Sequence, residues 1–435
     1  MDTKKLRQKI LDLAIHGKLV PQDPNDEPAS VLLERIRAEK ERLIKEGKIK
    51  RSKKSASDTP HYENIDFDIP SSWIITTLSE VFFMHAGKSI SAADISAEPN
   101  EKYRYLCVGG NGVRGYVSSY NTDGAHPIIG RQGALCGNIN YAEDLFYATE
   151  HAVVVDTFCE TETWWAYYFL IQLNLNQYAT ATAQPGLSVN TIGDVQIPLP
   201  PLEEQKRIVA AIEQWFSLID TLETAKEDLQ MCIAQTKSKI LDLAIHGKLV
   251  PQDPNDEPAI ELLKCINPKF TPCDNAHYEN VPSSWIKVPL GNICTLNEGE
   301  PITDKEYLYI DVKGLRTGNF ASKQSGKYVP VGTTLILVDG ENSGEVFYTP
   351  VEGYQGSTMK VLNNDSNMNT QYVLYFVNLH QRALRENKVG SAIPHLNKKM
   401  FRELIIPIPP IGEQERIVEA ILQYYRLLDN ISANL

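Results

Sequence analysis

The chain has 435 residues, of which 42% are hydrophobic, and a formal net charge of −12. This length is enough for two domains with their own cores and a connector. The sequence has no basic and apolar leader and no apolar run of about 18 residues, so we expect neither export nor a membrane span. The 7 cysteines include no CxxC pair, which is typical of a reduced cytosolic protein without a metal site.

The N-terminal region carries a segment that occurs twice without a change. Lys9–Ala29 and Lys239–Ala259 both read KILDLAIHGKLVPQDPNDEPA. The segment begins as a helix and then passes through one glycine and three prolines, which helical periodicity cannot explain. An identical irregular segment indicates an identical partner or an identical joint.

A basic stretch follows the first copy, at residues 35–54. It contains ten Lys and Arg and three Glu. A solvated helix face that runs into a linker is the ordinary interpretation of such a run. The alternative is contact with phosphate groups. That alternative would use Lys48, Lys50, Arg51, Lys53 and Lys54.

Two dissimilar blocks, at about residues 60–200 and 271–409, read as mixed α and β structure. Each has PSSW near its start, at Pro70–Trp73 and Pro282–Trp285, and then short apolar runs separated by Gly and Asn turns. A helix-like aromatic run follows, TWWAYYFLIQL in the first block and TQYVLYFVNLH in the second. We expect these aromatic side chains to form core rather than a surface that stacks on bases.

Each block ends in Pro-Pro, and a helix with Glu in its first turn follows. In the first of these helices, apolar residues recur with a strict 4-3 spacing that predicts a coiled-coil seam, interrupted only at Lys226 and Thr236. The seam positions are 212, 215, 219, 222, 226, 229, 233, 236, 240 and 243. The same spacing restarts at Ile417, and its other half precedes the first copy of the repeat, at Leu6, Ile10 and Leu13.

The pattern therefore predicts a helix made of two pieces that lies antiparallel to a helix made of one piece. The one-piece helix, residues 203–246, would be roughly 65 Å long at ~1.5 Å per residue and would hold the two blocks apart. The expected fold class is α+β: two mixed α/β domains separated by a long antiparallel coiled coil, with an internal pseudo-two-fold repeat. Such symmetry is suited to a palindrome-like target or to a pair of identical partners.

The architecture resembles the specificity subunit of Type I restriction-modification systems over essentially the whole chain. The two copies of PP-x-x-EQ-x-RIV and the doubled AIHGKLVPQ are the most specific features. The other segments that carry the resemblance are PSSWIITTLSEV (70–81), IIGRQGALCGN (128–138) and ATEHAVVV (148–155).

The resemblance implies a division of the chain into five parts. Residues 1–59 would be an N-terminal conserved helical region with a basic linker, and residues 60–200 the first target recognition domain. Residues 201–270 would be the central conserved region with the long coiled-coil helix, and residues 271–409 the second target recognition domain. Residues 410–435 would be a C-terminal conserved helix that packs with the N-terminal helix.

The resemblance also implies the function and the partners. The chain would be the DNA sequence-specificity subunit, each recognition domain would read one half of a bipartite double-stranded DNA site, and the helices would dock the other subunits. These are two modification subunits, which methylate adenine N6 with S-adenosylmethionine, and two restriction subunits, motor-nucleases that use ATP and Mg. The chain itself would hold no cofactor and would work in the cytoplasm of a prokaryote.

Candidate base contacts are side chains that present forked donors or acceptors, since Arg pairs with guanine, and Gln and Asn with adenine, in the major groove. In the first block they are Arg131 and Gln132, in a loop flanked by glycines, and then Arg114, Tyr120 and His151. In the second block the stretch VDGENSGE departs from GRQG and offers Asn342, with Lys313, Arg316, Lys327 and Tyr354 nearby. The alternative for each is a surface or loop-stabilising role.

The charge of the blocks limits how they could bind DNA. Residues 60–200 hold 5 Lys and Arg against 15 Asp and Glu, and residues 275–409 hold 13 of each. If DNA is the ligand, much of the phosphate neutralisation must therefore come from a partner.

Catalysis by the chain itself is not expected, because no HExxH, GxSxG or paired-carboxylate motif is present. Two other functions remain as alternatives. One is a non-enzymatic scaffold whose coiled coil joins two protein-binding domains. The other is a stand-alone methyltransferase or nuclease.

Overall fold

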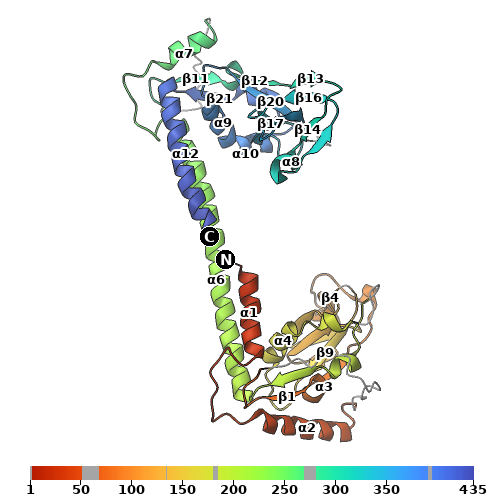
Figure 1. Ribbon diagram of the computed structural model, residues 1–435. Coiled ribbons are helices and arrows are strands. Elements are labelled where there is room, and N and C mark those ends of the chain that lie inside the picture. Colours follow the sequence, from red (N-terminus) through yellow and green to blue (C-terminus); the bar gives the residue numbers. More distant parts are fainter. Residues whose placement is uncertain (1, 51–67, 134, 180–184, 269–280, 390–393) are drawn as a thin grey trace. The chain divides into compact units, whose positions relative to one another are not determined.

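The computed structural model describes residues 2–50, 68–133, 135–179, 185–268, 281–389 and 394–435. The chain forms two compact units, Met1–Ala225 (unit 1) and Lys226–Leu435 (unit 2). The boundary falls inside helix α6 (Leu202–Ile245), which is labelled in Figure 1. Each unit therefore contains one of the two blocks together with helical segments from both sides of it.

Unit 1 combines short helices with three small sheets. Its helices are α1 (Thr3–Ile15), α2 (Ala29–Lys45), α3 (Leu78–Val81), α4 (Thr163–Gln172), α5 (Val189–Gly193) and the first part of α6, with 3-10 turns η1 (Ala92–Asp94) and η2 (Leu175–Tyr178). Its strands are β1 (Ile74–Thr77), β2 (Phe83–Ala86), β3 (Tyr105–Gly109), β4 (Gly112–Val117), β5 (Thr122–Asp123), β6 (His126–Gly130), β7 (Ile139–Ala142), β8 (Leu145–Ala148), β9 (Ala152–Asp156) and β10 (Gln196–Leu199). The strand orders are β1-β10, β2-β9-β6-β7 and β4-β3-β8-β5.

Unit 2 repeats this plan with changes. Its helices are the rest of α6, α7 (Ala259–Ile266), α8 (Val312–Thr317), α9 (Thr370–Leu379), α10 (Gln381–Glu386), α11 (Lys398–Glu403) and α12 (Ile411–Ala433), with the 3-10 turn η3 (Leu290–Asn292). Its strands are β11 (Ile286–Pro289), β12 (Cys294–Asn297), β13 (Glu300–Ile302), β14 (Tyr307–Ile310), β15 (Ala321–Lys323), β16 (Gly326–Val329), β17 (Thr334–Leu337), β18 (Val346–Tyr348), β19 (Gly353–Gln355), β20 (Met359–Asn364) and β21 (Ile405–Ile408). The strand orders are β11-β21, β12-β20-β17-β18 and β13-β16-β19-β14-β15.

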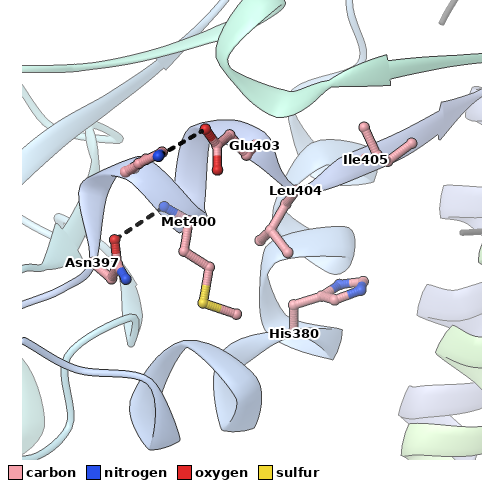
Figure 2. Close-up of a pocket in the computed structure, with 7 residues that line it drawn as sticks. His380, Asn397, Met400, Glu403, Leu404 and Ile405 are labelled. Carbon is pink, nitrogen blue, oxygen red and sulfur yellow. Dashed lines mark hydrogen bonds and ion pairs between the residues drawn. The ribbon is translucent and has the colours of Figure 1, made fainter. Parts of the chain in front are cut away.

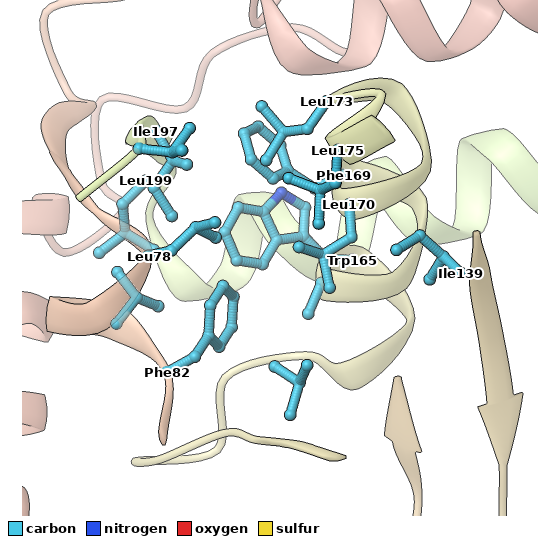
Figure 3. Packing of buried hydrophobic residues seen from close by; sticks show 14 of the residues in the cluster. Leu78, Phe82, Ile139, Trp165, Phe169, Leu170, Leu173, Leu175, Ile197 and Leu199 are labelled. Atoms are coloured by element: carbon cyan, nitrogen blue, oxygen red, sulfur yellow. The ribbon is translucent and has the colours of Figure 1, made fainter. Parts of the chain in front are cut away.

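The aromatic runs form helices at the core of each unit, as the sequence predicts. In α4, Trp165 and Phe169 are buried and pack with Leu78 and Phe82 of the α3 segment (Figure 3). In α9, Tyr372 and Phe376 are fully buried, and the Tyr372 hydroxyl donates to the carbonyl of Pro407. Because most of the aromatic surface is used for packing, these runs do not form a platform for stacking on bases.

Each unit contains an antiparallel helix pair, which confirms this part of the predicted coiled coil. In unit 1 the Arg7 guanidinium of α1 bonds the carboxylates of Asp220 and Glu223 of α6, at 2.6 and 3.1 Å. In unit 2 the Lys237 ammonium of α6 pairs with Asp429 of α12 at 2.5 Å. Arg7 and Lys237 also lie over aromatic rings, of Phe216 and Tyr425, at 5.0 and 5.1 Å. The two pairs thus use equivalent contacts.

Only four of the ten predicted seam positions are buried. Ile212, Ile219, Ile233 and Ile240 are buried, but Trp215, Leu222 and Leu229 are exposed by 47%, 43% and 38%. The alternate seam positions 215, 222 and 229 are therefore open to solvent. The physical reason is that the partner helix, α1 or α12, covers one flank of the apolar stripe and leaves the other open.

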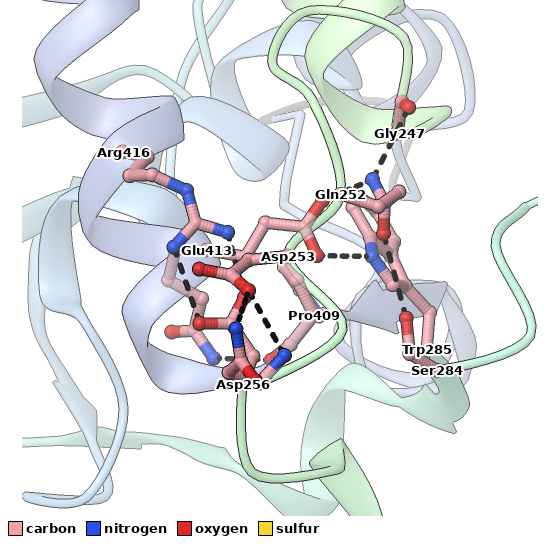
Figure 4. A network of polar contacts seen from close by, with 11 residues as sticks. Gly247, Gln252, Asp253, Asp256, Ser284, Trp285, Pro409, Glu413 and Arg416 are labelled. Atoms are coloured by element: carbon pink, nitrogen blue, oxygen red, sulfur yellow. Dashed lines mark hydrogen bonds and ion pairs between the residues drawn. The ribbon is translucent and has the colours of Figure 1, made fainter.

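The repeated segment forms an identical polar joint in the two units. In unit 2 the buried Glu413 carboxylate, in the first turn of α12, accepts hydrogen bonds from the Trp285 indole at 2.9 Å and from the Gln252 amide (Figure 4). In unit 1 the Glu204 carboxylate accepts from Trp73 and Gln22 in the same way. An Arg–Asp ion pair flanks each carboxylate. The pairs are Arg207–Asp26 and Arg416–Asp256.

The joint ties three repeated motifs together. It links the irregular segment, the PSSW turn and the N-terminus of the helix after Pro-Pro, so the duplicated sequence encodes a joint. The glycine in the segment has a positive φ, of 62° at Gly17 and 66° at Gly247. A Cβ atom at Gly17 would also lie 2.5 Å from the ring of Pro70, so a larger residue does not fit there.

The joint also fixes the ends of each block. Strand β1 follows Trp73 and pairs antiparallel with β10, which directly precedes the Pro-Pro turn. Strands β11 and β21 pair in the same way in unit 2. Each block therefore enters and leaves through one two-stranded ribbon next to the joint.

We predict that Trp73→Phe loosens the joint of unit 1 only. The change removes the indole donor and leaves the buried Glu204 carboxylate with one partner fewer, at a cost of about 1–3 kcal/mol of local stability. Native-state hydrogen exchange should show faster exchange around Gln22 and in the first turn of α6, with the equivalent peptides of unit 2 unchanged. Trp285→Phe is the matched control and should give the reverse pattern. Equal effects on both units, or none, would contradict this role.

Candidate nucleic-acid interface

Three loops of unit 1 meet at one end of its sheets, and we call them the reading loops. They are residues 109–114, from the β3–β4 turn into β4, residues 130–133 at the end of β6, and residues 149–151 between β8 and β9. Together they line a pocket that includes Arg114, Gln132 and His151. Three of the five predicted contacts of this block therefore lie together, although they are far apart in the sequence.

The reading loops touch through their backbones. The Arg131 amide donates to the carbonyl of His151 at 3.0 Å, and Gln132 forms an isolated bridge with Gly186. A Cβ atom at Gly130 would lie 2.2 Å from the carbonyl oxygen of Gly110, and one at Gly110 would lie 2.7 Å from that of His151. Glycine at these positions therefore allows the loops to converge.

Several buried polar atoms of the reading loops have no hydrogen-bond partner among the residues that the structure describes. They are Arg131 Nε, Thr149 Oγ1, Glu150 Oε2 and His151 Nδ1. A buried polar atom without a partner costs about 1–3 kcal/mol, and a cluster of them is typical of a functional site rather than of a folding core. Sequence reasoning missed Thr149 and Glu150, although both lie in the ATEHAVVV segment that carries the family resemblance.

Unit 2 contains the same backbone turn with different side chains. The Gly130 amide donates to the carbonyl of Asn138 in unit 1, and the Leu337 amide donates to that of Glu345 in unit 2. By this pattern Val338 and Asp339 take the places of Arg131 and Gln132, and Asn342 takes the place of Leu135. The sequence offered Asn342 as the candidate of this stretch, whereas the structural equivalent of Gln132 is Asp339, whose carboxylate lies 2.6 Å from Nδ1 of His395.

The other predicted contacts lie outside this loop. Tyr120 is 49% exposed and packs against Tyr105, and Lys313 is exposed on α8. Arg316 pairs with Glu345, and Lys327 pairs with Glu298. Each cation must break its ion pair within the protein before it can contact a phosphate or a base.

Tyr354 requires a correction. It is fully buried in β19, and its hydroxyl donates to the carbonyl of Lys305 at 2.5 Å. A side chain in the core with a satisfied hydroxyl cannot reach a base, so we remove Tyr354 from the candidate contacts.

The basic stretch is only partly described. Lys48 pairs with Glu46 at 2.8 Å and Lys50 is exposed, whereas Arg51, Lys53 and Lys54 lie outside the described residues. Within α2, burial lowers the pKa of Lys40 to about 8, against the raising effect of the Glu80 carboxylate. Its ammonium donates to the carbonyls of Ser79 and Phe82, at 2.5 and 2.8 Å, so this lysine ties α2 to the first block.

A charged cluster anchors the opposite end of the strands that carry the reading loops. Asp156 ends β9, and its carboxylate lies 3.2 Å from Nδ1 of His126, at the start of β6, and 3.4 Å from Nε2 of His85 in β2. Burial raises the pKa of Asp156, but the bonds to His126 and His85 outweigh it and lower this pKa to about 2. Burial lowers the pKa of His126, but Asp156 and the carbonyl of Asp123 outweigh it, so this pKa is raised.

A second pocket lies in unit 2, around α11 (Figure 2). Its polar groups are engaged in holding the helix. The Asn397 side chain accepts from the amide of Met400 at 3.1 Å, and Lys399 lies 3.9 Å from Glu403. Burial lowers the pKa of His380, whose Nδ1 lies 2.9 Å from the carbonyl of Phe376. We therefore do not favour this pocket as a binding site.

Among the described residues, no group of three or more His, Cys, Asp or Glu side chains is arranged to hold a metal ion. Cys273 lies outside the described residues. None of the described helices is both long enough and apolar enough to cross a membrane.

Comparisons with known proteins agree with the architecture. The family model described as the Type I restriction modification DNA specificity domain matches residues 70–231 and 282–435. The chain is 41% identical over 167 residues to the EcoprrI Type I specificity subunit of Escherichia coli, which covers 38% of this chain and 41% of that one. It is 30% identical over 403 residues to the EcoAI specificity subunit of Escherichia coli, covering 73% of this chain and 67% of that one.

The chain therefore spans between about two fifths and two thirds of the length of these two curated relatives. A solved structure concerned with complex assembly and conformational transition of the Type I restriction-modification system matches with a TM-score of 0.55. The match covers 84% of this chain and 93% of that one at 17% sequence identity, and it supports the fold.

We predict that Asp156→Asn destabilises β6 and β9 by about 2 kcal/mol, in a pH-dependent way. The contribution of Asp156 is present above about pH 4 and is lost as the pH falls toward 2. The contribution of His126 is present below about pH 6.5 and is lost as the pH rises through its raised pKa. Parent and variant should therefore differ most between about pH 4 and 6.5.

Hydrogen exchange of the β6 and β9 peptides, compared between parent and variant at each pH, measures this difference. Asp144→Asn, an exposed change in the same block, is the matched control. A difference that does not vary with pH, or an equal effect of the control, would rule out this electrostatic anchor.

Proposed function

Because the chain belongs to the family of Type I restriction-modification specificity subunits, we propose that it selects the DNA sequence on which the complex acts. Each block is a target recognition domain that reads one half of a bipartite site in the major groove. The chain acts as a non-catalytic component of the complex in the cytoplasm of a prokaryote. The chemistry belongs to partners: two modification subunits that use S-adenosylmethionine, and two restriction subunits that use ATP and Mg.

The observation that best supports this proposal is that the same backbone turn occurs in both units and carries different side chains in each. Unit 1 presents Arg131 and Gln132 where unit 2 presents Val338 and Asp339, on strands with the same hydrogen-bond pattern. Bases are distinguished by the donors and acceptors that face them, so these two turns would select different bases. The same backbone turn with different side chains in the two units is suited to reading two unlike half-sites.

Both units also leave the same apolar positions exposed on their helix pairs. In unit 1 these are Trp215, Leu218 and Leu222 of α6, and we call them the first apolar triplet. In unit 2 they are Tyr424, Leu427 and Ile431 of α12, the second apolar triplet. Their exposed fractions are 47%, 49% and 43% in the first triplet and 45%, 56% and 48% in the second.

The triplets are the proposed docking surfaces for two copies of the modification subunit. Three large apolar side chains with the spacing i, i+3, i+7 form one stripe along a helix, which is the pattern that a partner helix packs against. Because the stripe occurs once in each unit, two identical partners fit better than one. A cationic partner surface would also supply the phosphate contacts that the acidic first block lacks.

A scaffold that joins two protein-binding domains is the second candidate. It would use the same apolar triplets, but it gives no reason for the unpartnered polar atoms of the reading loops. It predicts no sequence preference on DNA, even with partners present.

We predict an asymmetric, gapped methylation motif. Single-molecule sequencing of DNA from cells that express this chain with its modification subunit should find N6-methyladenine in two unlike half-sites separated by a spacer. Neither protein alone should produce the motif. A perfect palindrome would contradict the assignment of different half-sites to the two blocks. No motif would favour the scaffold, and a motif from the chain alone would reveal a catalytic site in it.

We predict that Leu218→Glu and Leu427→Glu each remove one modification subunit from the complex. A charge in the middle of either apolar triplet leaves an ion buried at the interface, which should weaken docking at least 100-fold. Native mass spectrometry should show two modification subunits bound to the parent, one bound to either variant and none bound to the double variant. Thr224→Glu, exposed on another face of α6, is the control and should keep both. Unchanged binding in the double variant would show that the partners dock elsewhere.

A further inference from the structure

The reading loops of unit 1 contain two opposite charges that do not pair with each other. Arg114 and Glu150 line the same pocket. Burial raises the pKa of the nearby Cys107 thiol, the charge of Arg114 lowers it and the charge of Glu150 raises it. Arg114 forms no ion pair or hydrogen bond with any residue that the structure describes, and it is exposed. Glu150 lies 3.5 Å from Nε2 of His151, and its Oε2 is buried without a partner.

The two turns that carry these side chains lie next to each other. A Cβ atom at Gly109 would lie 2.8 Å from Cδ of Arg114 and 3.6 Å from Oγ1 of Thr149, the residue before Glu150. The Arg114 side chain therefore lies across the β3–β4 turn, next to the β8–β9 turn that carries Glu150. Thr149 is itself fully buried, and its amide donates to the carbonyl of Val108.

A carboxylate at a DNA-binding surface is repelled by the phosphates. It can favour binding only if it accepts a hydrogen bond from a donor on a base edge. In the major groove the donor suited to Glu is the N4 amino group of cytosine, and the acceptors suited to Arg are O6 and N7 of the paired guanine. The two edges of a G·C pair thus match the two opposite charges of the pocket.

We propose that the first block reads a G·C base pair through this pocket, with Arg114 donating to the guanine and Glu150 accepting from the cytosine. This inference rests on the proposed function. Glu150 is then a specificity-determining residue, and Thr149 is a positioning residue that holds the turn. The second block reads a different pair at the equivalent place, because Ser357 and Thr358 take the places of Glu150 and His151 there.

The test compares the methylation motif of the parent with those of Glu150→Gln and Arg114→Ala, each expressed as the full chain with the modification subunit. Genomic DNA of the host is the probe, and N6-methyladenine is scored by single-molecule sequencing. Both variants should relax the motif at the same single G·C position of one half-site. Discrimination against other pairs at that position should fall roughly 10- to 100-fold. The other half-site should not change.

Glu143→Gln, an exposed change at the β7–β8 turn of the same block, is the matched control and should leave the motif unchanged. The inference is overturned if Glu150→Gln leaves the motif unaltered, if the two variants relax different positions, or if both only lower methylation uniformly. A uniform loss would mean that the residues support folding or phosphate contact. Absence of any motif from the parent chain would instead contradict the proposed function itself.

Discussion

The arrangement of each unit depends on one buried carboxylate. Glu204 and Glu413 stand in the first turn of a helix, where the backbone amides favour negative charge, and each accepts hydrogen bonds from a tryptophan indole and a glutamine amide. Burial raises the pKa of both carboxyls in spite of these bonds. Burying a carboxylate costs free energy, and only hydrogen-bond donors at the correct positions offset that cost. The interaction therefore fixes the positions of its partners. Three segments distant in sequence are thereby held at one point.

This constraint separates the parts of the chain that must be alike from those that can differ. The joint and the β1–β10 or β11–β21 ribbon define where a block begins and ends. Inside that frame, unit 1 joins β3 to β4 by a short turn, whereas unit 2 inserts helix α8 between the corresponding strands β14 and β15, and the reading loops carry different side chains. A frame with fixed ends tolerates such changes because the contacts that hold it do not pass through the loops. Two blocks with different loops can therefore be held by the same kind of joint.

The sequence was most informative where a pattern repeats and least informative where side chains meet in space. The helix at 202–245, the aromatic core helices and the antiparallel pairing were all predictable, because periodicity and duplication report local geometry. The exposure of Trp215 and Leu222 could not be predicted, because a 4-3 spacing marks an apolar stripe but does not show how much of that stripe a partner helix covers. Tyr354 was misplaced for a related reason: its neighbours come from other strands. Glu150 was overlooked because nothing local marks a carboxylate as unpartnered.

The central claim is that two independent readers are mounted on identical joints. The most direct test replaces residues 74–199, from β1 to β10, with residues 286–408, from β11 to β21, so that both joints carry the second block. The methylation motif of this chain, expressed with the modification subunit, should then become symmetric, with two inverted copies of one original half-site around a gap. A motif that keeps both original half-sites, or a chimera that assembles with its partners but selects no sequence, would contradict the claim.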